Sequence, residues 1–570
     1  MQSEALQRAR AAAKARREAS GVRTEEERIK TLPTQDFVRR PDLVRKWTEA
    51  LRRTQDARPL RYVQAEILET GAWSANNTST AGIFGNVAVG GGKTLALFLL
   101  PEVMGAENAV LFLDPAMRIQ YESDLFEWSQ EYKFTPPTVV YYSELSQPGA
   151  TDLLRRLNPD LIMADEAQNL KNPTAARTKR FHRYMHESPD TRFVALTGTS
   201  TTSGLADYAH LMVLALRELA PLPLSTNMQE VWASILDSDI DASPDDAAWA
   251  QLRWLDPVAA SDRDRGAMRK AFFDLKQRTA GTVHTRASSC DARLEITAVF
   301  PALSQEVKDA VSEAVEDFTL PDGSPLIDAL QAHAAATQLS SGFYYVWDWP
   351  EDKVDLEWVE ARSEWGKACR NFLTYRSREG VDSPHLLERH LLTHGPRVDA
   401  TAHAALMKWL AQKDKPTPPT RPVWLDSSPV EWAIEWLESR ERGFIWFQNR
   451  AVGELLEAYG IPTFWSGMPD PEKHARCALS INVYHKGMNF QPWADQLVLE
   501  PMPNAATWEQ LLGRQHRSGQ LSPVVKCSVA QQTWPLQVRM RKALTRAAYI
   551  QESTGQPQKL LLANKTGFIR

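Results

Sequence analysis

Cysteine is scarce in this chain of 570 residues, and the four cysteines stand singly, at Cys290, Cys369, Cys477 and Cys527. Because none belongs to a CxxC pair, the sequence predicts neither a disulfide framework nor a zinc cluster. Long apolar runs are also missing, since the stretch at 95–100 is far shorter than the roughly 20 residues that cross a bilayer. The N-terminus is charged and has no secretory apolar core. We therefore expect a soluble, cytoplasmic protein with buried thiols and no membrane partner.

The composition is that of a globular protein with several domains. Apolar residues make up 43% and charged residues 24% of the chain, which excludes collagen-like, coiled-coil and wholly disordered proteins. The net charge of -5 hides an asymmetry, because residues 1–61 carry +7 and the remainder carries -12. A basic terminus favours an anionic partner such as a nucleic acid. A frayed, solvated helix at 5–18 would have the same composition, so both interpretations stay open.

Two regions of the sequence, roughly 60–215 and 428–545, alternate short apolar runs with helical patterns. This alternation is typical of parallel sheets that helices cover on both faces. The strands that we expect are residues 85–89, 110–113, 161–164 and 193–196 in the first region and 444–447, 496–499 and 524–529 in the second. The predicted fold class is therefore α/β, with two parallel-sheet lobes and a large, mainly helical insertion between them.

The predicted divisions of the chain follow from this pattern. They are a basic helical extension at 1–55, a first lobe at 56–290 with a helical protrusion from about 205, a helical insertion with a proline-rich linker at 291–425, a second lobe at 426–550 and a tail at 551–570.

A glycine-rich turn follows the first expected strand. Its residues are Gly90, Gly91, Gly92, Lys93 and Thr94. Main-chain N–H groups at such a turn, together with the start of the following helix, bind phosphate oxygens. The lysine can then reach the β- and γ-phosphates, and the threonine hydroxyl can ligate magnesium. The stricter form of the motif has a glycine where this chain has Val87, so the motif alone fits a structural turn equally well.

Two adjacent carboxylates, Asp165 and Glu166, follow the strand expected at 161–164. Asp165 can hold magnesium through its waters, and Glu166 can orient and deprotonate the water that attacks a γ-phosphate. An acidic pair after a strand is commonly only a helix N-cap. Combined with the lysine-bearing turn, however, the pair predicts a sheet that hydrolyses nucleoside triphosphates.

A pair of arginines in the second region completes the candidate site. Arg514 and Arg517 stand three residues apart, so in a helical turn both guanidinium groups project to one side. There they can neutralise phosphate charge across a cleft. An arginine finger contributes roughly 10³ to 10⁵ to the rate of phosphoryl transfer. Surface salt bridging is the alternative for both residues, and the glycine-rich turn favours the finger.

The order of these blocks resembles the superfamily-two helicase ATPases and, within them, the Swi/Snf-type translocases on double-stranded DNA, of a compact bacterial or phage type. The segments that carry the resemblance are residues 60–64, 165–168, 170–173, 196–199, 486–490 and 513–520. The resemblance implies two RecA-like lobes, ATP and Mg²⁺ bound between them, and duplex DNA lying across both. It also implies that a helix near 537–548 braces the second lobe against the first.

The resemblance further implies a role for individual residues. The catalytic residues would be Lys93, Asp165, Glu166, Arg514 and Arg517, with Thr94 and Asp165 at the metal. ATP would be bound by Gln64, which would read the adenine edge, and by Gly90, Gly91, Gly92, Lys93, Thr94 and Gln510. DNA would be contacted by Pro115, Thr197, Gly198, Thr199, Gly487 and Asn489.

Three functions remain open at this level. The leading hypothesis is an ATP-driven motor that moves on duplex DNA without necessarily separating its strands. The second is a strand-separating helicase on DNA or RNA. The third is a non-catalytic DNA-binding scaffold with a degenerate ATPase core, which is favoured by Val87 and by the short interval of 19 residues between Gly467 and Gly487.

Two patterns in the helical insertion favour ordinary structural roles. Trp358, Trp365 and Phe372 are spaced by seven residues and would line one face of a helix, which predicts core packing rather than a base-stacking platform. His390 and His394 could share a helix face as a metal site requires. No glutamate follows the first of them as in the zinc-protease helix, so we expect a solvated histidine face.

Overall fold

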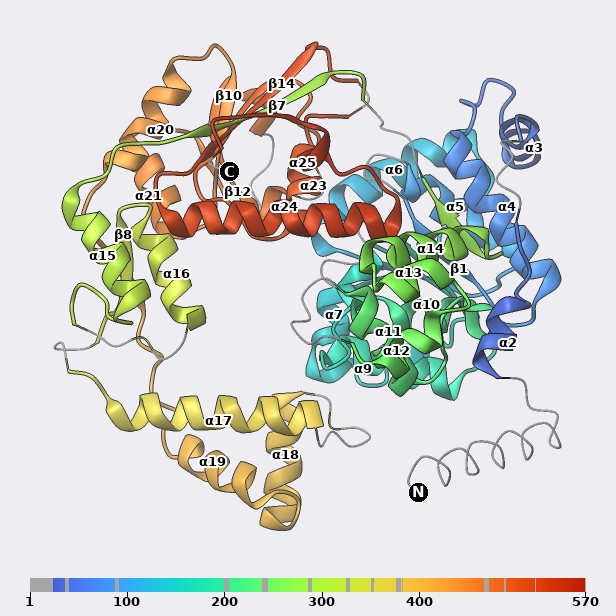
Figure 1. Ribbon diagram of the computed structural model, residues 1–570, viewed down its shortest axis with the longest axis horizontal. Helices are drawn as coiled ribbons and strands as arrows, with labels where there is room; N and C mark the ends of the chain where they lie inside the picture. Colours follow the sequence, from blue (N-terminus) through green and yellow to red (C-terminus); the bar gives the residue numbers. More distant parts are fainter. Residues whose placement is uncertain are drawn as a thin grey trace.

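The computed structural model describes residues 24–35, 40–87, 92–198, 204–237, 244–285, 290–323, 326, 329–349, 353–375, 381, 383–465, 471–485, 488–517 and 519–568. These residues form a first lobe and a second lobe, each built on one parallel sheet, and a helical arm that extends from the second lobe (Figure 1). The predicted α/β class with two parallel-sheet lobes is therefore confirmed. The basic segment 5–18 lies outside the described residues.

The first lobe is built on a six-stranded sheet with the spatial order β3-β2-β4-β5-β1-β6, and all its strand pairs are parallel. Its strands are β1 Ile83–Asn86, β2 Ala109–Leu113, β3 Thr138–Tyr141, β4 Leu161–Asp165, β5 Arg192–Thr197 and β6 Thr282–His284. The central strands are buried along almost their whole length, because helices cover both faces of the sheet. They read in the sequence as continuous apolar runs for this reason.

The first lobe contains helices that pack on the two faces of its sheet or on one another. They are α2 Glu25–Lys30, α3 Asp42–Leu51, α4 Tyr62–Asn77, α5 Lys93–Met104, η1 Pro115–Met117, α6 Arg118–Glu131, α7 Tyr142–Ser146, α8 Leu153–Leu157, η3 Ala167–Leu170, α9 Ala176–Glu187, α10 Ala209–Leu216, α11 Thr226–Leu236, α12 Asp246–Leu252, α13 Pro257–Asp262 and α14 Arg265–Arg278. Alternate residues of β2 enter different cores: Phe112 packs with Phe181 of α9, whereas Leu111 packs in the core that contains Phe98 of α5.

The second lobe is built on a seven-stranded parallel sheet with the spatial order β11-β12-β10-β13-β14-β7-β15. Its strands are β7 Arg293–Val299, β10 Gly443–Phe447, β11 Thr463–Phe464, β12 Arg476–Ser480, β13 Asp495–Val498, β14 Val524–Ala530 and β15 Asn564–Thr566. Two of them fall outside the segment 426–550 that the sequence predicts for this lobe. β7 opens the interval expected to be helical and β15 lies in the expected tail, so both divisions are corrected.

α-Helices pack on the sheet of the second lobe, and further elements connect this lobe to the arm. The helices of the lobe are α20 Ser428–Glu438, α21 Arg450–Ala458, α22 Ile481–Tyr484, α23 Ala505–Leu512, α24 Trp534–Thr554 and α25 Lys559–Leu562. The connecting elements are α15 Gln305–Glu316, α16 Ala329–Leu339 and the antiparallel pair β8 Phe343–Trp347 and β9 Thr420–Trp424. The short interval between positions 467 and 487 thus holds a full strand, β12, and a short helix, α22.

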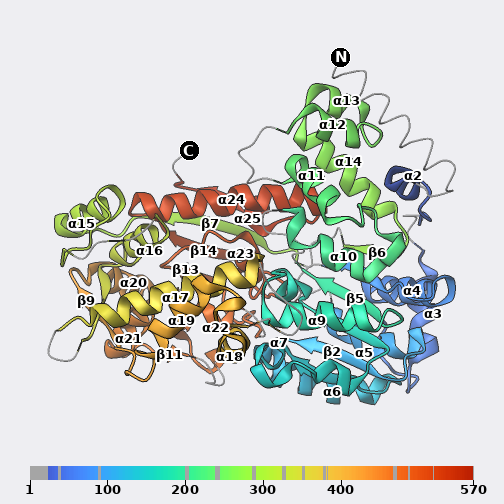
Figure 2. The same cartoon turned by 90° about the horizontal axis from the view of Figure 1, so that it is seen from below.

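The arm consists of α17 Leu356–Tyr375, α18 Pro384–His394, η7 Gly395–Arg397 and α19 Ala400–Leu410. Trp358, Trp365 and Phe372 are buried, which confirms the prediction of core packing for this stripe. The end of α17 also reaches the first lobe, where Lys179 Nζ of α9 donates a hydrogen bond of 2.7 Å to the carbonyl oxygen of Leu373 (Figure 2). The arm therefore contacts both lobes.

The described residues can be searched for a metal-binding cluster and for a membrane-spanning helix. Within it, no group of three or more His, Cys, Asp or Glu side chains is arranged to hold a metal ion. The rings of His390 and His394 lie 4.5 Å apart, and His394 is exposed. None of the helices in the described ranges combines the length and the apolar character that spanning a membrane requires. Cys477 and Cys527 are buried free thiols.

Helix α24 ties the two lobes together, running from the second lobe to α14 of the first (Figure 1). Near its end, Glu552 forms an ion pair of 2.9 Å with Arg269, and the carbonyl oxygen of Ser553 accepts a hydrogen bond of 2.7 Å from Lys276 Nζ. Gly555 ends the helix in a left-handed conformation with φ of 65°, and a Cβ there would lie 2.1 Å from the ring of Phe273. This junction therefore joins the second lobe to the first.

Candidate functional site

A cavity of about 420 Å³ lies between the two lobes, at the carboxyl ends of the first-lobe strands. Its first-lobe wall includes Gln64, Gly92, Lys93, Thr94, Asp165 and Glu166. Its second-lobe wall includes Asn489, Arg514 and Arg517. The lysine, the acidic pair and the arginine pair that the sequence singles out therefore line one cavity, although the arginines belong to the other lobe.

The lysine of the glycine-rich turn is held deep in this cavity. Gly92 caps the start of α5 in a left-handed conformation with φ of 80°, and a Cβ there would lie 2.4 Å from the amide nitrogen of Gln64. Lys93 Nζ lies 3.4 Å from the carbonyl oxygen of Val87 and donates a hydrogen bond of 3.1 Å to Glu166 Oε1. The side chain of Val87 is buried in the apolar core, and its main-chain carbonyl group faces the lysine.

Gln64 connects the start of α4 to the same turn. Its amide oxygen accepts a hydrogen bond of 2.7 Å from the main-chain N–H of Arg61, and its amide nitrogen donates one of 3.0 Å to the carbonyl oxygen of Gly92. The side chain is buried and lines the cavity. Gln64 thus lies where an amide could contact both the turn and a ligand beside it.

The acidic pair ends β4 and is tightly held. The main-chain N–H of Glu166 donates a hydrogen bond of 3.0 Å to Asp165 Oδ1, and Gln168 Nε2 donates one of 2.7 Å to Glu166 Oε2. Burial raises the pKa of Asp165 to about 6, while the positive charge of Lys93 opposes this rise. Glu166 adopts a left-handed backbone conformation, with φ of 54°, which is uncommon for a residue with a side chain.

The arginine wall faces these acids from the second lobe. Arg514 Nε donates a hydrogen bond of 2.9 Å to the carbonyl oxygen of His485, and its Nη1 donates one of 3.1 Å to that of Met488. Burial lowers the pKa of Arg514 to about 10, the charge of Arg517 lowers it further, and Glu166 acts in the opposite direction. The charge of Glu166 in the first lobe thus acts on Arg514 in the second lobe, so the two walls lie within electrostatic reach of each other.

Arg517 is also influenced by first-lobe charges. Its Nη1 donates a hydrogen bond to Asn489 Oδ1. Burial lowers the pKa of Arg517, the charge of Arg61 lowers it further, and Asp124 opposes both. Arg517 therefore lies within electrostatic reach of first-lobe groups of both signs.

The other predicted contact residues are more dispersed. Gln510 lies in α23 and is buried, outside the set of described residues that line this cavity. Pro115 begins η1 next to Asp114, which does line the cavity. Thr197 ends β5, is buried, and donates a hydrogen bond to Gln168 Oε1, with Gly198 directly after it. Four predicted residues lie outside the described ranges: Gly90, Gly91, Thr199 and Gly487.

Sequence reasoning missed several residues of the site. The guanidinium carbon of Arg58 lies 4.0 Å from the ring centroid of Trp128, and Arg58 forms ion pairs of 2.6 Å with Glu127 and 2.7 Å with Glu131. Both Arg58 and Trp128 line the cavity. The spacing of Arg58 and Trp128 in the sequence does not indicate that their side chains lie together. The position of Arg58 shortly before Gln64 is a signal that could have identified Arg58.

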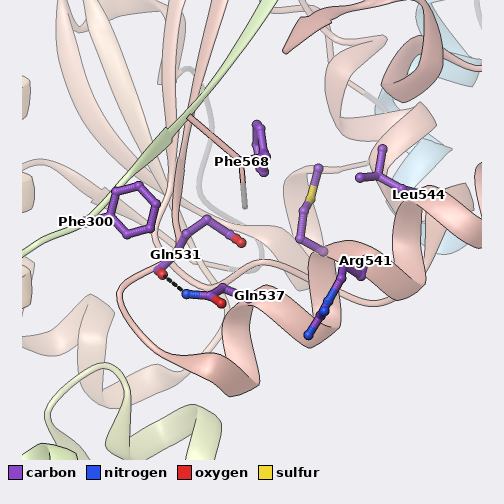
Figure 3. A pocket seen from close by; sticks show the side chains of 7 residues that line it. Phe300, Gln531, Gln537, Arg541, Leu544 and Phe568 are labelled. Atoms are coloured by element: carbon purple, nitrogen blue, oxygen red, sulfur yellow. Dashed lines mark hydrogen bonds between the residues drawn. The ribbon is translucent and has the colours of Figure 1, made fainter. Parts of the chain in front are cut away.

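A second hollow, between α24 and the C-terminal segment, is too small to be a ligand site. It is lined by Phe300, Gln531, Gln537, Met540, Arg541, Leu544 and Phe568 (Figure 3). Gln537 Nε2 donates a hydrogen bond of 3.0 Å to the carbonyl oxygen of Gln531 across its floor. Its volume of about 40 Å³ holds one or two water molecules, whereas small-molecule sites occupy roughly 300 to 1,000 Å³.

The residues of the interlobe cavity suit a magnesium-bound polyphosphate. The Thr94 hydroxyl and the Asp165 carboxylate supply the oxygen ligands that Mg²⁺ prefers. The start of α5 and the ammonium group of Lys93 supply partners for phosphate oxygens on one side. Arg514 and Arg517 supply them on the other.

Comparison with known proteins gives no family for this chain. No protein-family model matches it, and no curated protein matches it either.

Proposed function

We propose that this protein is an ATP-driven motor on double-stranded DNA, which hydrolyses ATP in the cavity between two RecA-like lobes. The main support is the convergence of Lys93, the acidic pair and the arginine pair on one cavity, from segments far apart in the sequence. A surface salt-bridge role for the arginines, the alternative raised by the sequence, does not account for Arg514, which is 8% exposed.

The first-lobe wall binds the triphosphate. The N-terminus of α5 and Lys93 hold the β- and γ-phosphates, and Thr94 and Asp165 would hold magnesium, which would offset phosphate charge. Phosphate oxygens compete with Glu166 for the ammonium group of Lys93. Once that contact is exchanged, the Glu166 carboxylate stays bonded to Gln168 through Oε2 and can accept a proton from the attacking water through Oε1.

The second-lobe wall makes hydrolysis depend on lobe position. Arg514 and Arg517 stabilise the charge that develops on the γ-phosphoryl group, but only when the second lobe lies close to the first. ATP binding therefore favours the closed arrangement, and hydrolysis followed by product release favours opening. Alternation of this kind moves the two lobes along a strand of the duplex, as the resemblance to Swi/Snf-type translocases implies.

The test is ATP turnover with and without linear duplex DNA. We expect DNA to stimulate wild-type turnover and Lys93→Ala to lower turnover by about 100-fold or more, because a cationic clamp on the transferring group is removed. Lys308→Ala, which removes an exposed lysine on α15, is the matched control and should behave as wild type. Turnover that ignores both DNA and the Lys93 substitution would refute the proposal.

Two further measurements separate this motor from its alternatives. Release of a labelled strand from a forked duplex would identify a strand-separating helicase instead. A titration calorimetry experiment that shows no binding of ATP to the wild-type chain would identify a non-catalytic scaffold.

A further inference from the structure

We propose that Tyr142 is a positioning residue for Glu166, because its buried hydroxyl holds the main chain on both sides of the Glu166 Cα atom. This role depends on the proposed function, since it matters for turnover only if Glu166 activates water. The sequence does not single out Tyr142, which follows β3 directly and begins α7.

Glu166 occupies a backbone conformation that needs outside support. Its φ of 54° and ψ of 55° place it in the left-handed region, where the Cβ atom crowds the main chain. Such conformations persist only where the surrounding contacts impose them. The conformation matters here because it directs the side chain to Lys93, 3.1 Å from Oε1, and to Gln168, 2.7 Å from Oε2.

The hydroxyl of Tyr142 contacts both peptide planes that define this conformation. It donates a hydrogen bond of 2.8 Å to the carbonyl oxygen of Asp165 and lies 3.4 Å from that of Glu166. The first carbonyl belongs to the peptide unit whose rotation sets φ of Glu166, and the second belongs to the unit that sets ψ. Asn169 supports the second unit from the other side, donating to the Glu166 carbonyl oxygen from its main-chain N–H at 2.9 Å and from its Nδ2 at 3.0 Å.

Tyr142 is itself fixed and stays protonated. Its side chain is buried, and its ring packs edge-on against Phe112 of β2, with 6.0 Å between the ring centroids. Burial raises the pKa of Tyr142 well above its usual value, and the charges of Asp165 and Glu166 raise it further. The hydroxyl is therefore a donor throughout the pH range in which proteins work.

Removal of the hydroxyl alone is the sharpest perturbation. Tyr142→Phe keeps the ring and its contact with Phe112, but leaves the Asp165 carbonyl without this donor. We expect kcat for ATP to fall about tenfold to 100-fold, because a displacement of about 1 Å in a catalytic group can cost that much. KM and the affinity for ATP should stay within about twofold of wild type, since the phosphate contacts of Lys93 and α5 do not involve Tyr142.

A matched control is available in the same core. The hydroxyl of Tyr184 is buried to the same extent and donates a hydrogen bond of 2.9 Å to the carbonyl oxygen of Pro159, away from the cavity. Tyr184→Phe should therefore leave kcat unchanged. A fall in kcat of equal size in both variants would show a general effect on folding and would overturn the assignment.

A double-mutant comparison tests whether Tyr142 acts through Glu166. In the Glu166→Gln background, the residual turnover should not fall further when Tyr142→Phe is added, because the group that the tyrosine positions is already disabled. A further fall by the same factor as in the wild-type background would overturn the proposal. Wild-type kcat in Tyr142→Phe would overturn it as well, without affecting the proposed function.

A structural measurement keeps the proposal testable if the wild-type chain proves inactive, which would refute the proposed function alone. Crystal structures of the wild-type chain and of Tyr142→Phe should differ at Glu166. We expect φ to leave the positive region in the variant and the Glu166 carboxylate to lose its contact with Lys93. Retention of the same backbone conformation and the same contact would overturn the positioning role.

Discussion

The two walls of the cavity are built in different ways. On the first-lobe wall, side chains hold one another, and Glu166 is bonded at both carboxylate oxygens. On the second-lobe wall, Arg514 is held by two main-chain oxygens and Arg517 by Asn489, all within that lobe. The first wall is therefore organised before a ligand arrives, whereas the second supplies charge whose position follows the position of its lobe.

Under the proposed function, this difference would couple ATP hydrolysis to movement of the lobes. A site that was complete on one lobe would hydrolyse ATP whatever the position of the other. Under the proposed function, the arginines of the second lobe stabilise the charge on the phosphoryl group fully only when the two lobes lie close together. The contacts between α24 and α14 join the two lobes.

Removal of the second wall should have the largest effect. We expect Arg517→Ala to lower kcat by about 10³ or more, since arginine fingers contribute 10³ to 10⁵ to phosphoryl transfer. ATP binding should persist, because the first wall is intact. Steady-state turnover and titration with a fluorescent ATP analogue measure the two quantities separately. Arg450→Ala, which removes an arginine of 80% side-chain exposure on α21, is the control, and equal losses in both variants would contradict the role of Arg517.

Low pH should weaken the binding of ATP and Mg²⁺ by the first-lobe wall. Burial raises the pKa of Asp165 to about 6, so the carboxylate becomes protonated below that pH and loses its capacity to hold magnesium. We expect the affinity for ATP in the presence of Mg²⁺ to fall by about tenfold for each pH unit below 6. Titration between pH 5 and 8 measures this. The Asp165→Asn variant should bind weakly with little dependence on pH, and a wild-type affinity that is flat across this range would contradict the account.

Substitution of Lys276, at the junction between the two lobes, should have a smaller effect, and on stability rather than on turnover. Burial lowers the pKa of Lys276 to about 7 from an ordinary value of 10.5, so between these limits the unfolded chain binds more protons than the folded one. Stability should therefore rise with pH across this window and level off below it.

Lys276→Met removes this titration and the cost of burying the charge. Its melting temperature relative to wild type should be highest near pH 7 and should decline toward pH 10. Differential scanning calorimetry at several pH values measures the difference. The exposed-site variant Lys308→Met should follow the wild-type curve, and a Lys276→Met curve that runs parallel to wild type would show that Lys276 does not titrate in this window.

The sequence predicts the first lobe better than the second, for a physical reason. Strands in the middle of a parallel sheet are buried on both faces, so β2, β4, β5 and β10 read as apolar runs that local patterns identify. In β7, buried residues alternate with more exposed ones. Its pattern suggests a half-buried strand, but only the tertiary fold decides that it pairs with β14 and β15.

The candidate site divides in the same way. Motif spacing identifies Lys93, Asp165 and Glu166, which follow strands β1 and β4, and the arginine pair, which follows helix α23. The positioning role of Tyr142 could not be predicted. It depends on a hydrogen bond from the Tyr142 hydroxyl, at the start of α7, to the main-chain carbonyl group of Asp165 at the end of β4. Such contacts arise from packing between strands and leave no local pattern in the sequence.

The most direct test of the account is retention of ADP with aluminium fluoride, a mimic of the transferring phosphoryl group. If both walls act on one triphosphate, the wild-type chain should retain about one such complex, and both Lys93→Ala and Arg517→Ala should lose it, while Lys308→Ala and Arg450→Ala keep it. Retention by Arg517→Ala at the wild-type level, with loss in Lys93→Ala, would contradict the claim that the second wall takes part.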